Sequence, residues 1–170
     1  GQIILQPQAT DLATLVMEQD KKYHTVAANN DLSLLIQLED NLPIALLDTP
    51  LVERMVETLI ANAIKYSPAK GHVKIVVTQV HGGEQEGTMG APLLRFQVTD
   101  QGPDVPTDIF DNIFKYLEQE SFKTVNRSTS ELGLAFCKMV ATAHGGRIYI
   151  EPNPTPNVTF TVDLPCTTYE

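Results

Sequence analysis

The stretch LVERMVETLIANAIKYSP, residues 51–68, decides the fold of this chain. Its apolar residues recur three and four positions apart, which is the spacing of a helix with one buried face. They are Leu51, Val52, Met55, Val56, Leu59, Ile60, Ala63 and Ile64. Thr49 is a suitable N-cap and Pro50 suits the first helical position. Ser67 before Pro68 marks the end, because proline disfavours helical geometry in the preceding residue.

The C-terminal end of this predicted helix is polar. Asn62 and Tyr66 lie one helical turn apart, with Lys65 between them in sequence. An amide oxygen, a cation and an aromatic face could together meet a metal ion, a phosphate and a base. The same residues could form the polar end of an ordinary core helix, and this stretch alone leaves both interpretations open.

Three later stretches carry further motifs. They are TDQGPDVP at residues 99–106, IFDNIFK at 109–115 and ELGLAFCKMVATAHGGRI at 131–148. With LIANAIKYSP at 59–68, these stretches resemble, in the same order, the asparagine box, first glycine box, phenylalanine box and second glycine box of sensor histidine kinases. The resemblance is to their ATP-binding domain, whose superfamily includes gyrase and the DNA mismatch-repair ATPases, and it spans nearly the whole chain.

The resemblance implies an α/β two-layer sandwich of the Bergerat type. Such a fold has a mixed, mostly antiparallel sheet covered on one face by about three helices. It also implies a single histidine-kinase-type ATP-binding domain over residues 1–170, with a flexible lid at about residues 101–130. We expect the dimerisation and phosphoacceptor domain to lie outside this chain.

Local patterns place the remaining elements. A helical pattern runs within residues 2–28, and turn residues follow it at 29–31 and again at 41–43. A second helix is predicted over 132–143, closed by glycines. The predicted strands are 32–38, 72–80, 93–99, 147–151 and 158–164.

Composition limits the classes of function. The chain has 170 residues, of which 42% are hydrophobic, enough for one soluble domain with its own core. Its formal net charge of −9 argues against a nucleic-acid partner, which needs clustered cations. No apolar run is long enough to span a membrane. Cys137 and Cys166 are too few for a disulfide framework, which favours the cytoplasm, including the cytoplasmic part of a membrane-bound sensor.

By resemblance, half of an ATP site is intact. Asn62 would carry a magnesium ion through its amide oxygen, Lys65 would touch the phosphates, and Tyr66 would stack near the adenine. Asp100 would accept a hydrogen bond from the adenine amino group, and Gly102 would let the backbone pass close to the base. All five residues are present in the sequence.

The phosphate-binding half departs from the family pattern. In the first glycine box the second glycine is replaced by Asp104, and in the second box Thr129, Glu131 and Gly133 stand at the three glycine positions. A carboxylate about 4 Å from a phosphate costs ~1 kcal/mol in water and up to ~4 kcal/mol near a protein surface. A micromolar-to-millimolar ligand has only about 4–8 kcal/mol of binding free energy in total.

Four hypotheses therefore remain open for the pocket. It could bind ATP weakly or not at all, it could belong to a pseudokinase that regulates signalling by contact, it could be a working Mg-ATP site, or it could take ADP or another adenine compound. A working site would need Asp104 and Glu131 to point to solvent or to be bridged by a divalent cation. Lys115, Lys123 and Arg127 in the expected lid could also offset the charge.

In an active relative, such a domain is a transferase component of a two-component system. It delivers the γ-phosphate to a histidine on a separate two-helix domain, and a response regulator acts downstream. The partners implied for this chain are therefore its own dimerisation helices and a response regulator, in a homodimeric full-length protein. We do not expect the chain alone to autophosphorylate, because no phosphoacceptor histidine is identifiable in it.

Hydrolysis of ATP is not expected either. Thr58 stands where the ATP-hydrolysing branch of the superfamily has a glutamate, and a threonine cannot take a proton from water. Glu57 is adjacent, but successive helical residues project about 100° apart.

The histidines have no ligand-spaced partners and neither cysteine lies in a CxxC pair, so we predict no metal site of histidines or cysteines and no redox site. His24, His72 and His81 are expected at the surface or in loops. His144, in the HGG end of the last predicted helix, is expected to be structural.

Overall fold

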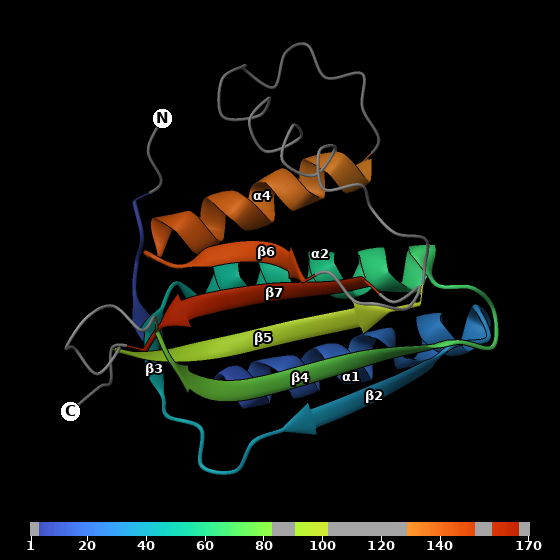
Figure 1. Ribbon diagram of the computed structural model, residues 1–170, viewed down its shortest axis with the longest axis horizontal. Helices are drawn as coiled ribbons and strands as arrows, with labels where there is room; N and C mark the ends of the chain where they lie inside the picture. The colour runs from blue at the N-terminus through green and yellow to red at the C-terminus, as the bar shows by residue number, and fades with distance from the viewer. Residues whose placement is uncertain (1–3, 83–90, 102–128, 152–157, 167–170) are drawn as a thin grey trace.

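The computed structural model describes residues 4–82, 91–101, 129–151 and 158–166 (Figure 1), with no description of the side chains of residues 129–132 and 151. Its elements, in chain order, are β1 (Gln8–Thr10), α1 (Leu12–Asn29), β2 (Ser33–Leu38), β3 (Ala45–Leu47), α2 (Thr49–Tyr66), β4 (His72–His81), β5 (Pro92–Asp100), α4 (Thr129–Ala143), β6 (Arg147–Glu151) and β7 (Val158–Pro165).

A five-stranded sheet forms one layer of the molecule. Its strand order is β2-β4-β5-β7-β6, in which β2 runs parallel to β4 and every other pair is antiparallel. Figure 1 looks onto the uncovered face of the sheet, with α1 and α2 behind it and α4 running beyond β6. The mixed two-layer sandwich predicted from the sequence is confirmed.

The predicted core helix is α2, and its apolar positions lie where the spacing placed them. All eight are buried except Leu51, which is partly exposed. The predicted N-cap is wrong by one residue. Asp48 caps the helix, with its Oδ1 accepting the Leu51 N–H at 3.3 Å, while the Thr49 hydroxyl bonds that of Thr10 at 2.7 Å. The helix ends at Ser67 as predicted.

Two short strands were not predicted. β1 and β3 contain three residues each and pair antiparallel, with Gln8 opposite Leu47. Three residues are too few to display an alternating pattern. The other described strands begin and end within one residue of their predicted bounds.

Glycines close α4 as predicted. Gly145 adopts φ +78°, and the Gly146 N–H bonds the Ala141 carbonyl at 2.8 Å, which is a glycine-terminated helix end. A Cβ on Gly146 would lie 2.0 Å from the Asp163 carbonyl oxygen, so the chain can pass this close to β7 only with glycine there.

His144 ties this end of α4 to the start of α2. Its Nε2 lies 3.0 Å from the backbone nitrogen of Asp48, and its Nδ1 lies 2.8 Å from the Val140 carbonyl oxygen. A backbone N–H can only donate, so Nε2 accepts and Nδ1 carries the proton. The ring is therefore held as one neutral tautomer between two helices.

Candidate functional site

The residues expected to form a site come from three elements that end on one side of the molecule. Asn62, Lys65 and Tyr66 occupy the last turns of α2, Asp100 ends β5, and Gly133 lies near the start of α4. Figure 1 shows the C-terminal ends of α2 and β5 and the N-terminal end of α4 at the same side. Helix α2 contacts both β5 and α4, so it is the common support of these residues.

Asn62 has an unsatisfied polar atom. Its side-chain nitrogen is buried and has no hydrogen-bond partner among the described residues. A buried donor without a partner costs about 1–3 kcal/mol. A half turn of the amide exchanges its nitrogen with its oxygen, so this position can offer a donor to an anion or an acceptor to a cation. Asn62 therefore fits the hard oxygen ligand that magnesium requires.

Ser67 adds a second unsatisfied atom at the same helix end. Its Oγ is also buried and without a partner in the described part of the chain. The sequence indicated Ser67 only as a helix terminator, because a serine before proline gives no separate signal of binding. Two buried polar atoms five positions apart, both unmatched, distinguish this helix end from an ordinary C-terminus.

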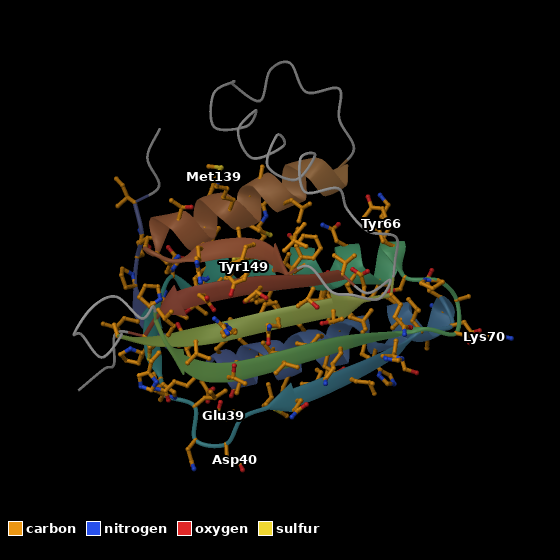
Figure 2. The ribbon with its side chains drawn as sticks, viewed as in Figure 1. Glu39, Asp40, Tyr66, Lys70, Met139 and Tyr149 are labelled. Carbon is orange, nitrogen blue, oxygen red and sulfur yellow. The ribbon has the colours of Figure 1, made fainter. Side chains whose placement is uncertain are left out.

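Lys65 and Tyr66 form an exposed pair beside these atoms. The Lys65 Nζ lies 5.5 Å from the centre of the Tyr66 ring, and Tyr66 is 45% exposed although it is a large aromatic residue. Figure 2 shows Tyr66 at the end of α2, pointing away from the body of the molecule. A cation and an accessible aromatic face are thus held at one place.

Asp100 is buried at the end of β5. It is 4% exposed and pairs in register with Val158 of β7. It continues the buried alternation of the strand, so it lies on the face that the helices cover. The next residue, Gln101, is fixed by its Oε1, which accepts the His72 N–H at 3.0 Å. The carboxylate thus has a defined place on the helix side of the sheet.

Gly133 is required by the packing of α4 on α2. A Cβ at this position would lie 2.7 Å from the Cγ2 of Thr58. Thr58 and Asn62 are one helical turn apart on the same face of α2, so the contact of Gly133 lies one turn before the asparagine. Helix packing is therefore sufficient to explain this glycine.

The Thr58 hydroxyl is already committed within its own helix, because it donates to the Arg54 carbonyl at 2.8 Å. The Arg54 guanidinium in turn lies 4.4 Å from the Phe136 ring centre, so a second contact, one turn further along α4, joins the two helices.

Helix α4 begins at Thr129, three residues before its predicted start. The backbone over Thr129–Gly133 is therefore helical, where the resemblance would place a glycine loop. Glycine costs about 1 kcal/mol more than alanine in a helix, whereas threonine and glutamate cost less. Replacing two glycines therefore favours this extra turn. The side chains of Thr129 and Glu131 lie outside the description.

Several expected site residues also lie outside the described part of the chain. These are Gly102, Asp104, Lys115, Lys123 and Arg127, together with nearly all of the expected lid. Within the described ranges, no cluster of three or more histidine, cysteine or acidic residues could hold a metal ion. Cys137 and Cys166 are unpaired and buried, and no described helix is long and apolar enough to cross a membrane.

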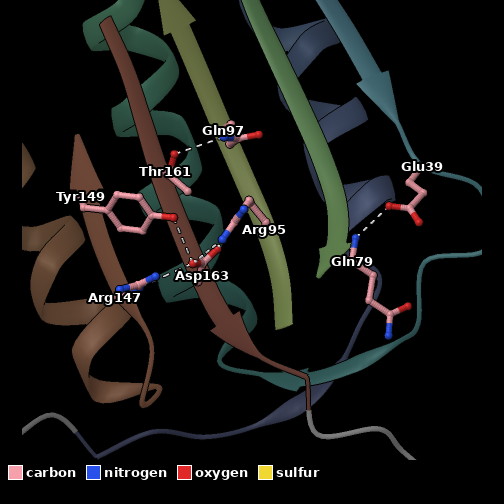
Figure 3. Close-up of polar contacts among 8 residues, drawn as sticks. All are labelled: Glu39, Gln79, Arg95, Gln97, Arg147, Tyr149, Thr161 and Asp163. Atoms are coloured by element: carbon pink, nitrogen blue, oxygen red, sulfur yellow. Dashed lines mark hydrogen bonds and ion pairs between the residues drawn. The ribbon is translucent and has the colours of Figure 1, made fainter. Parts of the chain in front are cut away.

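A second polar cluster lies on the uncovered face of the sheet (Figure 3). Asp163 is almost completely buried there, and Arg95 contacts both its carboxylate oxygens, at 2.8 and 3.1 Å. The Tyr149 hydroxyl donates to the same carboxylate at 3.3 Å, and Arg147 lies 3.6 Å from it. The carboxylate is thus paired with the cations and the hydroxyl around it. We therefore interpret the cluster as structural support for the face of the sheet that no described helix covers.

Comparison of the amino-acid sequence with known proteins identifies a family and several relatives. The family described as histidine kinase-, DNA gyrase B- and HSP90-like ATPase matches residues 47–168. The adaptive-response sensory kinase SasA of Synechocystis sp. is 27% identical over 158 residues, covering 91% of this chain and 38% of that protein. The hybrid signal transduction histidine kinase D of Dictyostelium discoideum is 30% identical over 124 residues, covering 72% of this chain and 8% of that protein.

Solved structures share the fold. Full-length ShkA in complex with AMPPNP superposes with a TM-score of 0.79 at 24% identity, over 99% of this chain and 33% of that one. The catalytic domain of histidine kinase ThkA, in a nucleotide-free form, gives 0.75 at 19% identity, over 95% of this chain and 97% of that one. In fold, this chain thus matches nearly all of the ThkA chain and about a third of the ShkA chain.

Proposed function

This chain belongs to the family of histidine kinase-, DNA gyrase B- and HSP90-like ATPases, as a catalytic domain of the sensor histidine kinase type, and we propose that its nucleotide pocket keeps a working adenine half beside a weakened phosphate half. The domain would bind ATP weakly or not at all. In the full-length protein it would act with its own phosphoacceptor helices and with a response regulator.

The observation that carries this proposal is the pair of unsatisfied polar atoms on Asn62 and Ser67. The phosphate oxygens of a bound nucleotide could accept hydrogen bonds from such atoms, and its metal ion could bind an amide oxygen. Asn62 would hold magnesium together with phosphate oxygens, and magnesium would neutralise phosphate charge. Lys65 would pair with a phosphate and Tyr66 would cover the base.

Asp100 would select adenine. A buried carboxylate at a fixed place on the sheet is suited to accept a hydrogen bond from an exocyclic amino group. Gly102, the next glycine in sequence, would allow the base to lie against the backbone, and Arg127 would add a cation toward the phosphates. These two roles follow from the family alone.

The phosphate half is weakened for two reasons. The helical backbone over Thr129–Gly133 uses the Gly133 N–H in a bond to the carbonyl four residues earlier, so that N–H is not available to a phosphate. A glutamate in the first turn of a helix also brings a negative charge near the positive helix end, so Glu131 would compete with any phosphate for that end.

Calorimetric titration with ATP and ADP, with and without magnesium, tests the proposal. We expect the native domain to bind ADP at least as tightly as ATP, because ATP carries one more phosphate toward the acidic side chains. An Asp104→Gly, Glu131→Gly double variant should bind Mg-ATP at least about tenfold more tightly than the native domain, which corresponds to about 1.4 kcal/mol. Native affinity for Mg-ATP equal to that of the variant would contradict the weakened phosphate half.

The variant Asp100→Asn tests the adenine half of the pocket. It keeps the shape of the side chain and replaces one acceptor oxygen by a donor, so it should weaken ADP binding about tenfold or more while circular dichroism stays unchanged. If Asp100→Asn binds ADP as the native domain does, the adenine is not read by this residue.

A second candidate function is regulation by contact, as a pseudokinase module. It is favoured by the direct packing of α4 on α2 at Gly133 and Thr58, which joins the two helices through their own residues. Absence of any nucleotide binding, in both the native domain and the double variant, would favour this function over the first.

A further inference from the structure

The two edges of the sheet are protected to different degrees. At one edge, β6 has five residues, begins with Arg147 and ends with Glu151, and α4 packs beside it. At the other, β2 has the sequence SLLIQL, without a charge or a proline. It pairs with β4 in an unbroken register over all six residues, so it contains no bulge. Charges, prolines and bulges are the usual devices that keep edge strands from pairing further.

The backbone of β2 presents unused hydrogen-bonding groups. The Ser33 N–H bonds the Gly71 carbonyl and the Glu39 N–H bonds the Val77 carbonyl, so the odd-numbered residues face β4. Backbone groups alternate along a strand, so the N–H and C=O groups of Leu34, Ile36 and Leu38 point to the open edge. No described strand pairs with that edge, which lies at the rim of the sheet in Figure 1.

The side chains of β2 offer an apolar surface beside these groups. Leu35 is 49% exposed on the uncovered face of the sheet. On the opposite face, Leu34, Ile36 and Leu38 are only partly buried although they pack against the main core. A strand added here would cover both rows.

Acidic residues at the ends of β2 indicate the charge that a partner would need. Glu39 and Asp40 follow the strand and are exposed, and Figure 2 shows Asp40 at the rim of the molecule beyond the end of β2. Asp31, also exposed, precedes the strand. In a symmetric antiparallel pair of two β2 strands, Asp40 would lie near Asp31 of the second copy, and opposed like charges destabilise such a pair.

We propose that the open edge of β2 binds an extended segment of another protein, with apolar residues at alternate positions and lysine or arginine at the end that lies beside Asp40. Main-chain hydrogen bonds to Leu34, Ile36 and Leu38 hold the segment, and the cations pair with the acidic end of the edge. The inference does not depend on nucleotide binding.

Titration of the 15N-labelled domain with the blocked peptide VTVTVKK tests this site. The amide signals of Leu34, Ile36 and Leu38 are expected to shift most and to saturate. The same peptide with every backbone nitrogen methylated should not bind, because it cannot donate to the ladder from either of its edges. The peptide VTVTVEE should bind about fivefold more weakly at low salt, and this difference should shrink as salt is added. Equal binding of the methylated peptide, or shifts confined to other parts of the chain, would overturn the proposal.

Two variants separate the edge from the rest of the surface. Ile36→Pro removes an N–H that faces the open edge and leaves the β4 ladder intact, so it should weaken binding at least about tenfold. Leu35→Lys should weaken it as well, whereas Met17→Lys, which makes the same change of charge at a 51% exposed position of α1, should not. If light scattering finds a dimer that Leu35→Lys dissociates, the occupant is a second copy and the proposal is wrong.

Discussion

Gln19 is the least expected residue of the core. It is 3% exposed on α1, and its Oε1 has no hydrogen-bond partner among the described residues. A buried polar atom without a partner lowers the stability of the fold by about 1–3 kcal/mol. We expect Gln19→Leu to raise the free energy of unfolding by ~1–2 kcal/mol in urea titrations. Glu18→Leu, at an exposed neighbouring position, should change it by less than ~0.5 kcal/mol, and a loss of stability in Gln19→Leu would show that the amide has a role in the fold.

Gly133 and Thr58 form a pair that a double-mutant cycle can measure. Alanine is favoured over glycine in a helix by about 1 kcal/mol, but an added Cβ would lie 2.7 Å from the Thr58 methyl carbon, and overpacking costs about 1–3 kcal/mol. Gly133→Ala alone should therefore destabilise the domain by ~1 kcal/mol. In the background of Thr58→Ser, which removes that methyl group, the same change should stabilise it by a similar amount. Equal effects in both backgrounds would contradict the packing role of this glycine.

The Cys137 thiol is buried between α2 and α4, and burial raises its pKa far above the ordinary value of 9.0. The folded state therefore keeps the proton when the unfolded state loses it. The resulting stabilisation is complete below the unfolded pKa and is lost progressively as the pH rises above about 9. Urea titrations from pH 7 to 10 should show stability falling above pH 9, and the fall should be smaller in Cys137→Ala by up to about 1.4 kcal/mol per pH unit. The same slope in both proteins would exclude Cys137 as the cause.

At the scale of elements, the start of α2 depends on one side chain. Asp48 accepts the N–H of Leu51 at 3.3 Å and the N–H of Gln6 at 3.0 Å, so it caps the helix and also holds the N-terminal segment. Asp48→Ala should lower the free energy of unfolding by ~1–2 kcal/mol. Asp48→Asn, which keeps one acceptor oxygen, should lower it by less than half as much. Equal losses in thermal or urea unfolding would mean that the negative charge, not the cap, supplies the stability.

The long elements could be predicted because their periodicity is long enough to read. The seven buried residues of α2 and the bounds of β6 follow directly from the sequence. The sequence could not distinguish Thr49 from Asp48 as the cap, because both residue types are good N-caps and the choice rests on Thr10, a tertiary partner. β1 and β3 exist only as partners of each other, so local pattern does not reveal them.

The candidate site could be predicted only in part, for similar reasons. Asn62, Lys65 and Tyr66 could be grouped because they share one helix. The place of Asp100 depends on how β5 pairs with β7, and the unmatched Oγ of Ser67 depends on what surrounds it, which no spacing in the sequence reveals. Gly133 was predicted as part of a phosphate loop, and the structure adds a packing reason for it.

At the scale of the whole molecule, the two faces of the sheet differ in their chemistry. On the helix side, the buried rows of β4, β5 and β7 form the core with the described helices α1, α2 and α4. On the open side, the Asp163 cluster with Arg95 and Arg147 takes the place of a second covering layer. Both proposed binding places lie away from this cluster, one at the ends of α2 and β5 and the other at the β2 edge.

The position of β7 also determines when the sheet can be completed during synthesis. β7 follows β5 and β6 in the sequence, yet it lies between them in the sheet and pairs with both. While a ribosome is still making residues before 158, β5 has an unpaired side and β6 has no strand neighbour. The sheet therefore cannot be completed until β7 has left the ribosome and inserted between β5 and β6. Until then the unpaired strand edges remain accessible to chaperones.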